Sequence, residues 1–364
     1  MISDDTQSEP GPVSGRASGR ASGQTSDQTS DQTSDQTSSR TGAPEGDQAF
    51  RATRNRERWP DAAYAGALSF LRRRYTDSLD DVDVAVCGIP WDGAVTYRSG
   101  CRLGPRAIRA ASVQLAELMA FPSGIDVLTE LSIVDRGDCP IDPHHPGEVT
   151  DRIERYAREV LDGGALMATL GGDHFISYPL LRAHAAKHGP IALVQFDAHC
   201  DTWEDDGRSL DHGVMFARAA AEGIVDTGRS TQVGLRTWND TDAGFRILSS
   251  PWIHRNGIGA AIEVVRERAG DAPVYLSFDV DGLDPSCAPG TGTPVVGGLA
   301  SWQALELVRG LAGLNLVGMD VVEVSPAYDH AEITALAAAT IVHDWLVCVA
   351  MNRGAKPLPA VGGA

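Results

Sequence analysis

Three potential metal ligands occupy alternate positions in one short segment of the chain, Phe196-Asp197-Ala198-His199-Cys200-Asp201. The apolar run at 191–194 precedes this segment and is typical of a buried strand. Because alternate side chains of a strand point to the same face, Asp197, His199 and Asp201 are expected to lie on one side together. The spacing therefore predicts half of a metal site, and the alternative is a strand end whose acids simply face water.

Two other expected strands end in groups of the same kind. His174 follows the strand expected at 165–170 after a pair of glycines, which permit a tight turn and a close approach of the backbone. Asp279 and Asp281 follow the strand expected at 274–278, again two positions apart. Taken singly, the histidine could cap the next helix and the two aspartates could belong to a turn. Because three strands end in such groups, a shared metal site is favoured.

The six candidate ligands comprise two imidazoles and four carboxylates, with no thiolate. They are His174, Asp197, His199, Asp201, Asp279 and Asp281. This mixture of nitrogen and oxygen donors suits Mn(II), with Fe, Co, Ni or Zn as alternatives. Four carboxylates exceed what a single catalytic zinc ion commonly takes, so the set indicates two ions that share carboxylates. Two ions about 3.5–4 Å apart can lower the pKa of a shared water molecule by several units and provide hydroxide at neutral pH.

Two further acids near these strand ends have other interpretations. Asp284 precedes Pro285 and is expected to have a structural role in a turn. Glu323 follows the strand expected at 316–322, where a carboxylate would either hold the cationic group of a substrate or pair with an arginine. Its position alone does not decide between these two roles.

The chain alternates between apolar runs rich in Val, Ile and Leu and segments with helical spacing. The expected strands lie at 82–90, 131–135, 165–170, 191–196, 230–235, 274–278 and 316–322. The expected helices lie at 61–74, 105–119, 148–161, 176–188, 212–221, 259–269, 302–311 and 331–350. This alternation predicts an α/β fold with a mostly parallel central sheet that is covered by helices on both faces. Ligands bind such sheets beyond the carboxyl ends of the strands, which is where the candidate ligands are expected.

The first 48 residues are expected to form a disordered, low-complexity tail, and residues 49–364 a single domain. The tail contains the repeat Gln-Thr-Ser-Asp at 24–27, 28–31 and 32–35 and almost no large apolar side chains. It cannot bury enough surface to offset its chain entropy. Nothing after residue 48 marks a second domain.

The charge and the cysteine content limit the classes of binding partner and the cellular locations to be expected for this protein. The formal net charge is −18, of which the first 48 residues contribute −5. This acidity argues against nucleic acid and anionic membranes as partners and is compatible with a small cationic molecule. The six cysteines form no CxxC pair and are expected to be reduced thiols. No signal-peptide pattern appears and no apolar run reaches the roughly 18 residues of a membrane span, so the cytoplasm is the expected location.

Three motifs resemble the signatures of the ureohydrolases, the arginase and agmatinase superfamily. They are Gly171-Gly172-Asp173-His174, Phe196-Asp197-Ala198-His199-Cys200-Asp201 and Ser277-Phe278-Asp279-Val280-Asp281-Gly282-Leu283-Asp284-Pro285. The resemblance extends from about Val82 to the last expected helix, and the segments at 175–184, 288–299 and 318–329 are similar to the agmatinase branch in particular. It implies a three-layer α/β/α ureohydrolase catalytic domain, two Mn(II) ions, cleavage of a guanidino group to urea and an amine, and usually a homotrimer or homohexamer.

The resemblance also implies a role for each candidate residue. One ion would be held by His174, Asp197, Asp201 and Asp279. The other would be held by Asp197, His199, Asp279 and Asp281, so that Asp197 and Asp279 bridge the two. Glu323 matches the glutamate that binds the guanidinium group, and His212, in Leu210-Asp211-His212-Gly213, matches the histidine that transfers a proton.

Two residues depart from the family pattern. Cys200 stands where threonine is commoner, and Gln195 stands where histidine is common. Both are expected to lie between the inward-pointing positions and to face the opposite side. The tail before residue 49 has no counterpart in the usual family pattern.

The loop at 202–209 is expected to select the substrate. Arginases carry Ser, Thr or Asn residues in this loop to hold an α-carboxylate, whereas this chain carries three consecutive acids, Glu204, Asp205 and Asp206. These acids would repel a carboxylate and suit the free ammonium group of agmatine, or else they form an ordinary solvated loop. The expected reaction is the hydrolysis of agmatine to putrescine and urea, a step of polyamine biosynthesis.

Three alternatives remain open to different degrees. Arg208 in the same loop would suit a hydrolase for a guanidino acid, such as guanidinobutyrate or guanidinopropionate, on the same site. A catalytically silent homologue that acts as a binding or regulatory subunit is disfavoured because all six ligands are present. A single-zinc deacylase is disfavoured by the additional ligands His174 and Asp281.

Overall fold

A computed structural model of the protein describes residues 63–207 and 209–358. All of these residues fall within one compact unit. The expected tail, its boundary with the domain expected at 49–364, and Arg208 lie outside the described residues.

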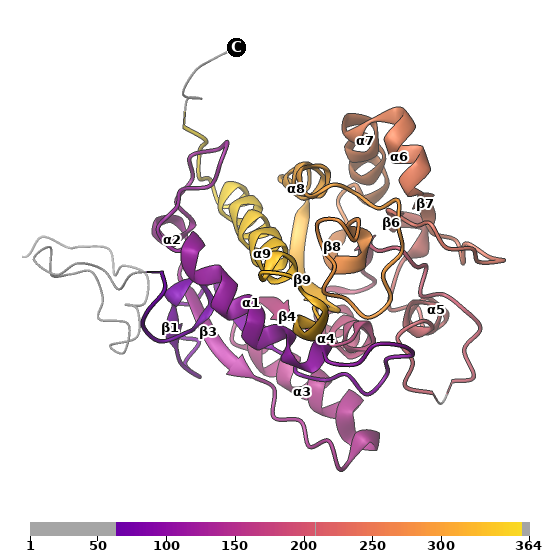
Figure 1. The fold of residues 1–364 in the computed structure, drawn as a ribbon, viewed down its shortest axis with the longest axis horizontal. Coiled ribbons are helices and arrows are strands. Elements are labelled where there is room, and N and C mark those ends of the chain that lie inside the picture. Colours follow the sequence, from indigo (N-terminus) through magenta and orange to yellow (C-terminus); the bar gives the residue numbers. More distant parts are fainter. Residues whose placement is uncertain (1–62, 208, 359–364) are drawn as a thin grey trace, which may run out of the picture. The chain divides into compact units, whose positions relative to one another are not determined.

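The centre of the fold is a sheet of nine parallel strands (Figure 1). The strands are β1 (Arg74–Tyr75), β2 (Val84–Gly88), β3 (Ile133–Asp138), β4 (Leu166–Leu170), β5 (Ala192–Phe196), β6 (Thr231–Val233), β7 (Arg246–Leu248), β8 (Pro273–Asp279) and β9 (Asn315–Val322). Their order in the sheet is β1-β3-β2-β4-β9-β8-β5-β6-β7. Every residue of β2 and β5 is buried, which explains why these strands read as continuous apolar runs. The expected α/β fold with a parallel sheet is confirmed.

The four strands that precede the candidate residues are neighbours in the sheet, in the order β4-β9-β8-β5. Val321 of β9 pairs with Leu170 of β4 on one side and with Phe278 of β8 on the other. Phe278 in turn pairs with Phe196 of β5. The carboxyl ends of all four strands therefore meet at one edge of the sheet, although they are far apart in the sequence.

Helices cover both faces of the sheet. Those among the described residues are α1 (Gly104–Ser112), α2 (Val127–Glu130), α3 (Val149–Asp162), α4 (Ser177–His188), α5 (Met215–Ala221), α6 (Ser250–Asn256), α7 (Ile258–Ala269), α8 (Ser301–Arg309) and α9 (Ile333–Asn352). One hydrophobic cluster joins the sheet to α1, α7, α8 and α9, and a second joins it to α3, α4 and α5. Alternate residues of β5 divide between the two clusters, with Val194 and Phe196 in the first and Leu193 in the second. This is the three-layer α/β/α arrangement.

The long closing helix α9 belongs to the core. Among the described residues it is the one helix that is long and apolar enough to cross a membrane by length and composition. However, 78% of its apolar stretch is buried inside the fold. The expectation that no apolar run reaches this length referred to uninterrupted apolar residues. His343 and Asp344 interrupt the apolar run within the continuous helix α9 but leave the helix apolar on average.

Some elements near the edges of the sheet differ from the expectation. In the described part of the helix expected at 61–74, the chain instead forms a 3-10 turn at Phe70–Arg72 and the strand β1. The main-chain N–H of Phe70 donates to the Asp135 carboxylate at 2.8 Å, and Leu71 has a φ of 48°, so tertiary contacts override the helical spacing. β7 and α6 were not expected, because they are too short to show a clear period.

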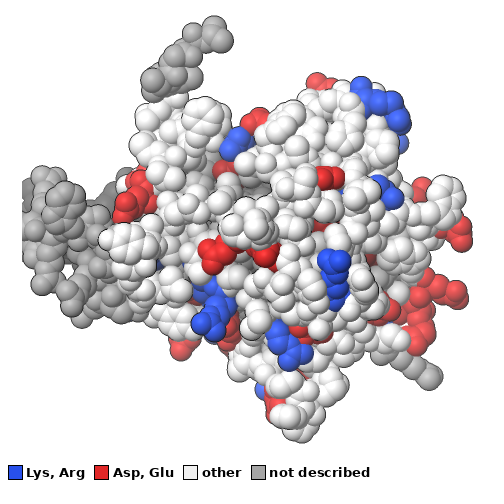
Figure 2. All heavy atoms as spheres, in the orientation of Figure 1, with Lys and Arg blue, Asp and Glu red and all other residues white. Residues whose placement is uncertain are grey.

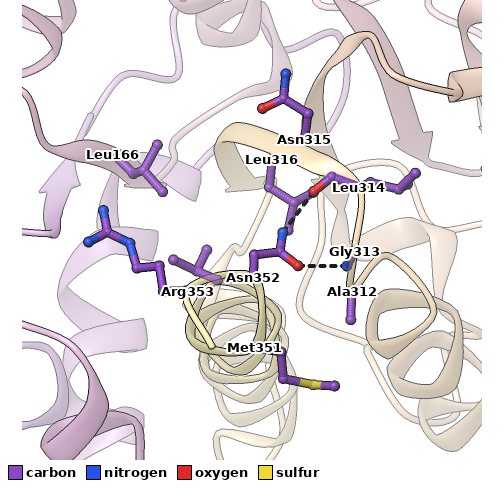
Figure 3. Close-up of a pocket in the computed structure, with 10 residues that line it drawn as sticks. Leu166, Ala312, Gly313, Leu314, Asn315, Leu316, Met351, Asn352 and Arg353 are labelled. Carbon is purple, nitrogen blue, oxygen red and sulfur yellow. Dashed lines mark hydrogen bonds between the residues drawn. The ribbon is translucent and has the colours of Figure 1, made fainter. Parts of the chain in front are cut away.

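A pocket of about 630 Å³ lies at the opposite, amino-terminal edge of the sheet (Figure 3). It is lined by Leu166 and Asn315, where β4 and β9 begin, and by the end of α9. The Asn352 side chain accepts a hydrogen bond from Gly313 N at 2.6 Å and donates one to Leu314 O at 2.7 Å. The candidate ligands do not line this pocket.

Charged side chains are dispersed over the face shown in Figure 2. Acidic and basic residues lie there in separate small groups, and most of the visible surface is uncharged. The acidity of the chain is therefore not gathered into one patch on this face.

Candidate metal centre and active site

The candidate ligands meet at the carboxyl edge of the sheet because they follow strand ends directly. Asp197 is the residue after β5, and Asp279 is the last residue of β8. His174 opens the 3-10 turn that follows β4. Since β4, β9, β8 and β5 pair in parallel, the residues at their carboxyl ends converge at one edge of the sheet.

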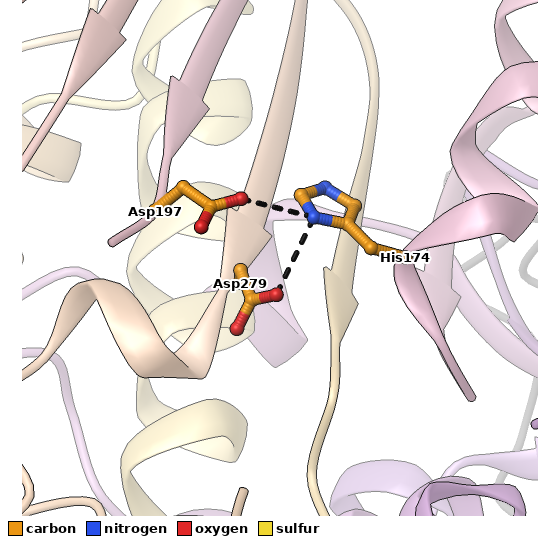
Figure 4. A group of neighbouring side chains, drawn as sticks. All are labelled: His174, Asp197 and Asp279. Carbon is orange, nitrogen blue, oxygen red and sulfur yellow. Dashed lines mark ion pairs between the residues drawn. The ribbon is translucent and has the colours of Figure 1, made fainter. Parts of the chain in front are cut away.

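Three carboxylates surround the imidazole of His174. Its Nδ1 atom lies 2.9 Å from Oδ2 of Asp201, 3.1 Å from Oδ2 of Asp197 and 3.4 Å from Oδ2 of Asp279. Figure 4 shows the carboxylates of Asp197 and Asp279 pointing toward the same ring nitrogen. All four side chains are buried. One imidazole nitrogen and several carboxylate oxygens at such spacing form a group that can hold a metal ion.

A second group forms around His199. Its Nδ1 atom lies 3.0 Å from Oδ2 of Asp281 and 3.4 Å from Oδ1 of Asp197. Asp197 thus turns one carboxylate oxygen toward each histidine, as a bridging ligand requires. Asp279 differs, because its Oδ2 atom faces His174 while its Oδ1 atom accepts the main-chain N–H of Asp281 at 2.8 Å. The structure therefore places Asp279 with the first group.

Burial makes this cluster of carboxylates costly unless cations accompany it. Burial, and then the neighbouring charge of Asp197, raise the pKa of Asp201 to about 7 and also raise the pKa of Asp281. Burial and the charges of the neighbouring aspartates raise the pKa of Asp279 well above its usual range. Burial alone would raise the pKa of Asp197 too, but its hydrogen bonds with the two histidines lower it. Two divalent cations would offset this repulsion, so the residues present fit a pair of metal ions.

Hydrogen bonds behind His174 leave its Nδ1 atom available as a ligand. Its Nε2 atom lies 2.8 Å from Oγ of Ser277, which donates to Oδ1 of Asp320 at 2.7 Å. Asp320 is buried and also accepts hydrogen bonds from Ser177 and Tyr275. This series of hydrogen bonds favours the tautomer of His174 with hydrogen on Nε2. Metal-binding histidines commonly donate the hydrogen of their second ring nitrogen in this way.

Glu323 directly follows β9 and stands beside the first group. Its Oε1 atom accepts the main-chain N–H of His174 at 2.9 Å and lies 2.9 Å from Nδ1 of His212. Its Oε2 atom is buried and forms no hydrogen bond with any described residue. A Cβ atom added at Gly292 would lie 3.4 Å from Oε2, so the glycine leaves space on that side of the buried carboxylate. A buried carboxylate oxygen without a hydrogen-bond partner can accept hydrogen bonds from a cationic group.

His212 lies in the loop before α5, because that helix begins at Met215 rather than at residue 212 as expected. Its Nε2 atom lies 2.9 Å from Oγ1 of Thr96, on the loop that follows β2. Burial by itself would lower the pKa of His212, but the hydrogen bond and charge of Glu323 raise it to about 9. The ring is therefore protonated at neutral pH and can act as a proton donor.

Two of the candidate residues have strained backbones. Asp201 has a φ of 52° and Glu323 a φ of 64°, in the left-handed region that residues other than glycine seldom occupy. Such conformations persist where the surrounding structure holds them, and they cluster at functional sites. In both cases the turn aims a carboxylate into the space shared with His174.

The expectations for three residues near the motifs have different outcomes. Gln195 was expected to face away from the ligands, and this is wrong: its side chain donates to Oδ2 of Asp197 at 2.8 Å. The reason is the period of a strand, since positions 195 and 197 lie on the same face. Cys200 does point elsewhere, and its sulfur accepts a hydrogen bond from Asn239 at 3.0 Å. The structural role of Asp284 is confirmed, because its carboxylate accepts the N–H groups of residues 286, 297 and 298.

The three acids of the loop at 202–209 are not equivalent. Asp205 forms a two-point ion pair with Arg218 of α5, with distances of 2.8 and 2.6 Å. Asp206 accepts hydrogen bonds from the main chain and side chain of Ser209. Glu204 is exposed and forms no ion pair with a described residue. Asp205 and Asp206 thus help to hold the loop in place, and Glu204 takes no part in these contacts.

Sequence reasoning missed the residues that support the predicted ones. Thr96 contacts His212 from 116 positions away, and Ser277 contacts Asp320 because the two are paired across β8 and β9. Asp320 lies within β9, two residues before its end, whereas Thr96 lies eight residues after the end of β2. A search of strand ends for polar groups, rather than for metal ligands alone, would have included Asp320 but not Thr96.

The sequence is similar to a known protein family and to individual proteins of named function. Residues 82–348 match the model of the Arginase family. The chain is 57% identical over 292 residues to a protein of Chromobacterium violaceum named agmatinase, covering 80% of this chain and 90% of that protein. It is 46% identical over 299 residues to an agmatinase of Escherichia coli O7:K1, covering 81% of this chain and 97% of the relative.

Solved structures give the same picture. A hypothetical agmatinase from Burkholderia thailandensis is 55% identical with a TM-score of 0.80, covering 80% of this chain and 94% of that one. Proclavaminate amidino hydrolase from Streptomyces clavuligerus is 34% identical with a TM-score of 0.74, covering 80% of this chain and all of the other. The residues that match the Arginase family model, 82–348, include all the strand ends that carry candidate ligands.

Proposed function

The chain belongs to the arginase family, and from this membership we propose that it hydrolyses the guanidino group of agmatine to putrescine and urea. The relatives named agmatinase support the substrate, and the paired His and Asp groups support a hydrolase that depends on two metal ions. The observation that carries the proposal is the position of Glu323. Its free oxygen lies beside the first metal group, where a guanidinium can be held against the reacting centre.

We assign the metal ligands as the family resemblance implies. His174, Asp197, Asp201 and Asp279 would hold one ion, and Asp197, His199, Asp279 and Asp281 the other. Mn(II) suits this mixture of donors. When bound, two such ions supply Lewis acidity and lower the pKa of water between them.

The protein's own residues would orient the substrate and move the proton. A guanidinium is always charged at neutral pH and donates hydrogen bonds in one plane, so the free Oε2 atom of Glu323 is suited to orient it. The amine that leaves when the C–N bond breaks must gain a proton. His212 can supply it from Nε2, the atom that contacts Thr96, while its Nδ1 atom remains against Glu323.

The remaining parts of the proposal concern location, assembly and the preference for charge. We expect the protein to act in the cytoplasm as a homotrimer or homohexamer. The exposed Glu204 would favour the ammonium end of agmatine over a carboxylate. The guanidino acids guanidinobutyrate and guanidinopropionate are the substrates that compete with this assignment.

The test is a urea-release assay on the Mn(II)-loaded protein with agmatine, arginine, guanidinobutyrate and guanidinopropionate side by side. Agmatine should give the highest kcat/KM. A preference for any carboxylate-bearing substrate would overturn the assignment, and no urea from any of the four would favour a silent homologue.

The metal assignment has its own test in Asp279→Ala. Because Asp279 sits within the first group and its Oδ1 atom holds the main chain of Asp281, the variant should lose both bound metal and turnover. Asp271→Ala is the matched control, since Asp271 lies exposed just before the same strand and pairs with Arg229. Full activity in Asp279→Ala would show that the two-ion assignment is wrong.

A further inference from the structure

Arg236 links the two segments that carry the second group of ligands. It follows β6, and its main-chain N–H donates to the carbonyl oxygen of Ala198 at 3.0 Å. Thr237 adds two more hydrogen bonds to the same oxygen, from its main-chain N–H at 3.2 Å and from its hydroxyl at 3.0 Å. Ala198 lies between Asp197 and His199. The backbone at Arg236 is therefore fastened to the middle of the first ligand segment.

The guanidinium of Arg236 is fastened to the other ligand segment. It donates hydrogen bonds to five backbone carbonyl oxygens, those of Gly234, Asp281, Gly282, Leu283 and Val295. The shortest, at 2.6 Å, is to the carbonyl of Asp281 itself. Five N–H groups in a rigid plane are thus used on three chain segments: the end of β6, the turn after β8 and the loop at 288–299.

Glycines make room for this arrangement. A Cβ atom added at Gly298 would lie 2.7 Å from Nη2 of Arg236, and one added at Gly282 would lie 2.9 Å from the main-chain nitrogen of Asp197. Gly234 has a φ of 96°, a conformation that glycine adopts readily and other residues adopt only with strain. In this conformation its carbonyl oxygen accepts a hydrogen bond from Arg236. The three glycines let the guanidinium and the ligand backbones approach closely.

We propose that Arg236 is a positioning residue for the second metal ion: it fixes the backbone of Asp281 relative to that of Asp197 and His199. The inference rests on the two-ion centre proposed above. In contrast, His174 and Asp201 of the first group form none of the hydrogen bonds that Arg236 makes. Loss of Arg236 should therefore weaken the second ion more than the first.

If only the charge of Arg236 mattered, its loss would change metal affinity in the opposite direction, which makes the proposal testable. Among the described residues, no carboxylate forms an ion pair with Arg236, although Asp281 and Asp197 are near enough to oppose the lowering of its pKa by burial. A cation so close to a metal site repels a divalent ion. If Arg236 acted only through its charge, removing it would tighten metal binding. If it acts by holding the ligand backbones, removing it will loosen metal binding.

Three variants separate these effects. Arg236→Lys keeps the charge, but the lysine ammonium has fewer N–H donors than the guanidinium and lacks its planar geometry, so it cannot bond to all five carbonyl oxygens. Arg236→Gln removes the charge and keeps one planar NH₂ group. Arg268→Lys is the matched control, because Arg268 also donates to three backbone carbonyls, those of Thr227, Ser230 and Gly244, away from the ligands.

The experiment is a Mn(II) titration of each metal-free protein, with free Mn(II) followed by electron paramagnetic resonance and folding checked by circular dichroism. The wild type and Arg268→Lys should bind two ions. Both Arg236 variants should bind one ion normally and the other about 10–100-fold more weakly, as is typical when a residue that orients ligands is lost. The thermal midpoint of the metal-free protein should fall by similar amounts in Arg236→Lys and Arg268→Lys.

Other outcomes overturn the proposal in distinguishable ways. Wild-type affinity for both ions in Arg236→Lys, tighter binding in Arg236→Gln, or equal weakening of both ions would each refute the selective positioning role. A wild type that binds fewer than two ions would instead refute the two-ion centre, and this inference with it.

Discussion

The Nδ1 atom of His212 lies 2.9 Å from Oε1 of Glu323, the same oxygen that accepts the main-chain N–H of the predicted ligand His174. One carboxylate therefore joins the residue expected to transfer a proton to the residue expected to bind metal. Its second oxygen forms no hydrogen bond with a described residue and is the atom proposed to hold a cationic substrate. A single side chain thus holds the proposed positions for substrate orientation, proton supply and metal binding in fixed relation.

This contact predicts a pH-dependent contribution to stability. Burial by itself would lower the pKa of His212, but Glu323 raises it from the usual 6.5 to about 9. The folded chain then holds this proton more tightly than the unfolded chain. The resulting stability is fully present below about pH 6.5 and is lost as the pH rises through about 9, with a total on the order of 3 kcal/mol.

Urea unfolding of the metal-free wild type and of His212→Asn checks this prediction. The difference in the free energy of unfolding between the two proteins should shrink by on the order of 3 kcal/mol between about pH 6 and about pH 10. His145→Asn is a suitable control, because His145 is exposed and pairs with Asp142 at the surface. A difference that stays constant with pH would show that Glu323 does not raise the pKa of His212.

The contact between His174 and Ser277 predicts a second effect, on metal affinity. Ser277→Ala removes the acceptor for Nε2 of His174 and separates the ring from Asp320. Metal binding should weaken by about 10–100-fold, because the ring loses the group that fixes its tautomer and orientation. The measurement is the Mn(II) dissociation constant at constant pH.

Ser230→Ala is the matched control for this variant. Ser230 is also buried and hydrogen-bonded on both sides, to Leu193 N and Asp226 O, but it contacts no predicted ligand. Both variants should lose some thermal stability, and only Ser277→Ala should lose metal affinity. Equal metal affinity in the two would leave Ser277 with a packing role alone.

The strand ends were predictable because their information is local. A buried strand followed by acids and histidines at every second position can be recognised without knowing its neighbours, and parallel strands bring such ends to one edge. The same alternation of side chains along a strand also places Gln195 on the face of Asp197, two positions away. That error came from assigning the wrong parity to one residue.

The supporting contacts were not predictable in this way, because they depend on register and on loops that meet in space. Ser277 and Asp320 are partners only because β8 and β9 pair at those positions. Thr96 reaches His212 across 116 residues of chain. In the loop at 202–209, three acids look alike in the sequence, and only the fold shows that Asp205 is already paired with Arg218.

The space beside Glu323 predicts an effect on substrate binding alone. In Gly292→Ala, the new methyl group would lie 3.4 Å from Oε2 of Glu323 and 3.0 Å from the carbonyl oxygen of Arg98. The φ of Gly292 is not in the left-handed region, so alanine fits the backbone conformation, and the neighbouring atoms are what its methyl group must displace. The KM for agmatine should rise about tenfold, a loss of about 1.4 kcal/mol in binding, while Mn(II) affinity stays unchanged.

Gly259→Ala controls for the general effect of adding a methyl group. Gly259 lies in α7 with open space around it, so the variant should be neutral or slightly more stable. An unchanged KM in fully loaded Gly292→Ala would mean that the guanidinium does not approach Oε2 of Glu323 from this side.

The loop at 202–209 predicts that one of its three acids sets the preference for charge. Glu204→Gln should raise the KM for agmatine several-fold and lower the KM for guanidinobutyrate, because the variant removes an exposed negative charge that attracts an ammonium and repels a carboxylate. The effect should diminish at high salt, where exposed charges are screened. Asp205→Asn should act differently, since it breaks the ion pair with Arg218 and loosens the loop for both substrates alike. Steady-state kinetics with the two substrates at low and high salt would distinguish these variants, and a loss of preference in Asp205→Asn with none in Glu204→Gln would reverse the assignment.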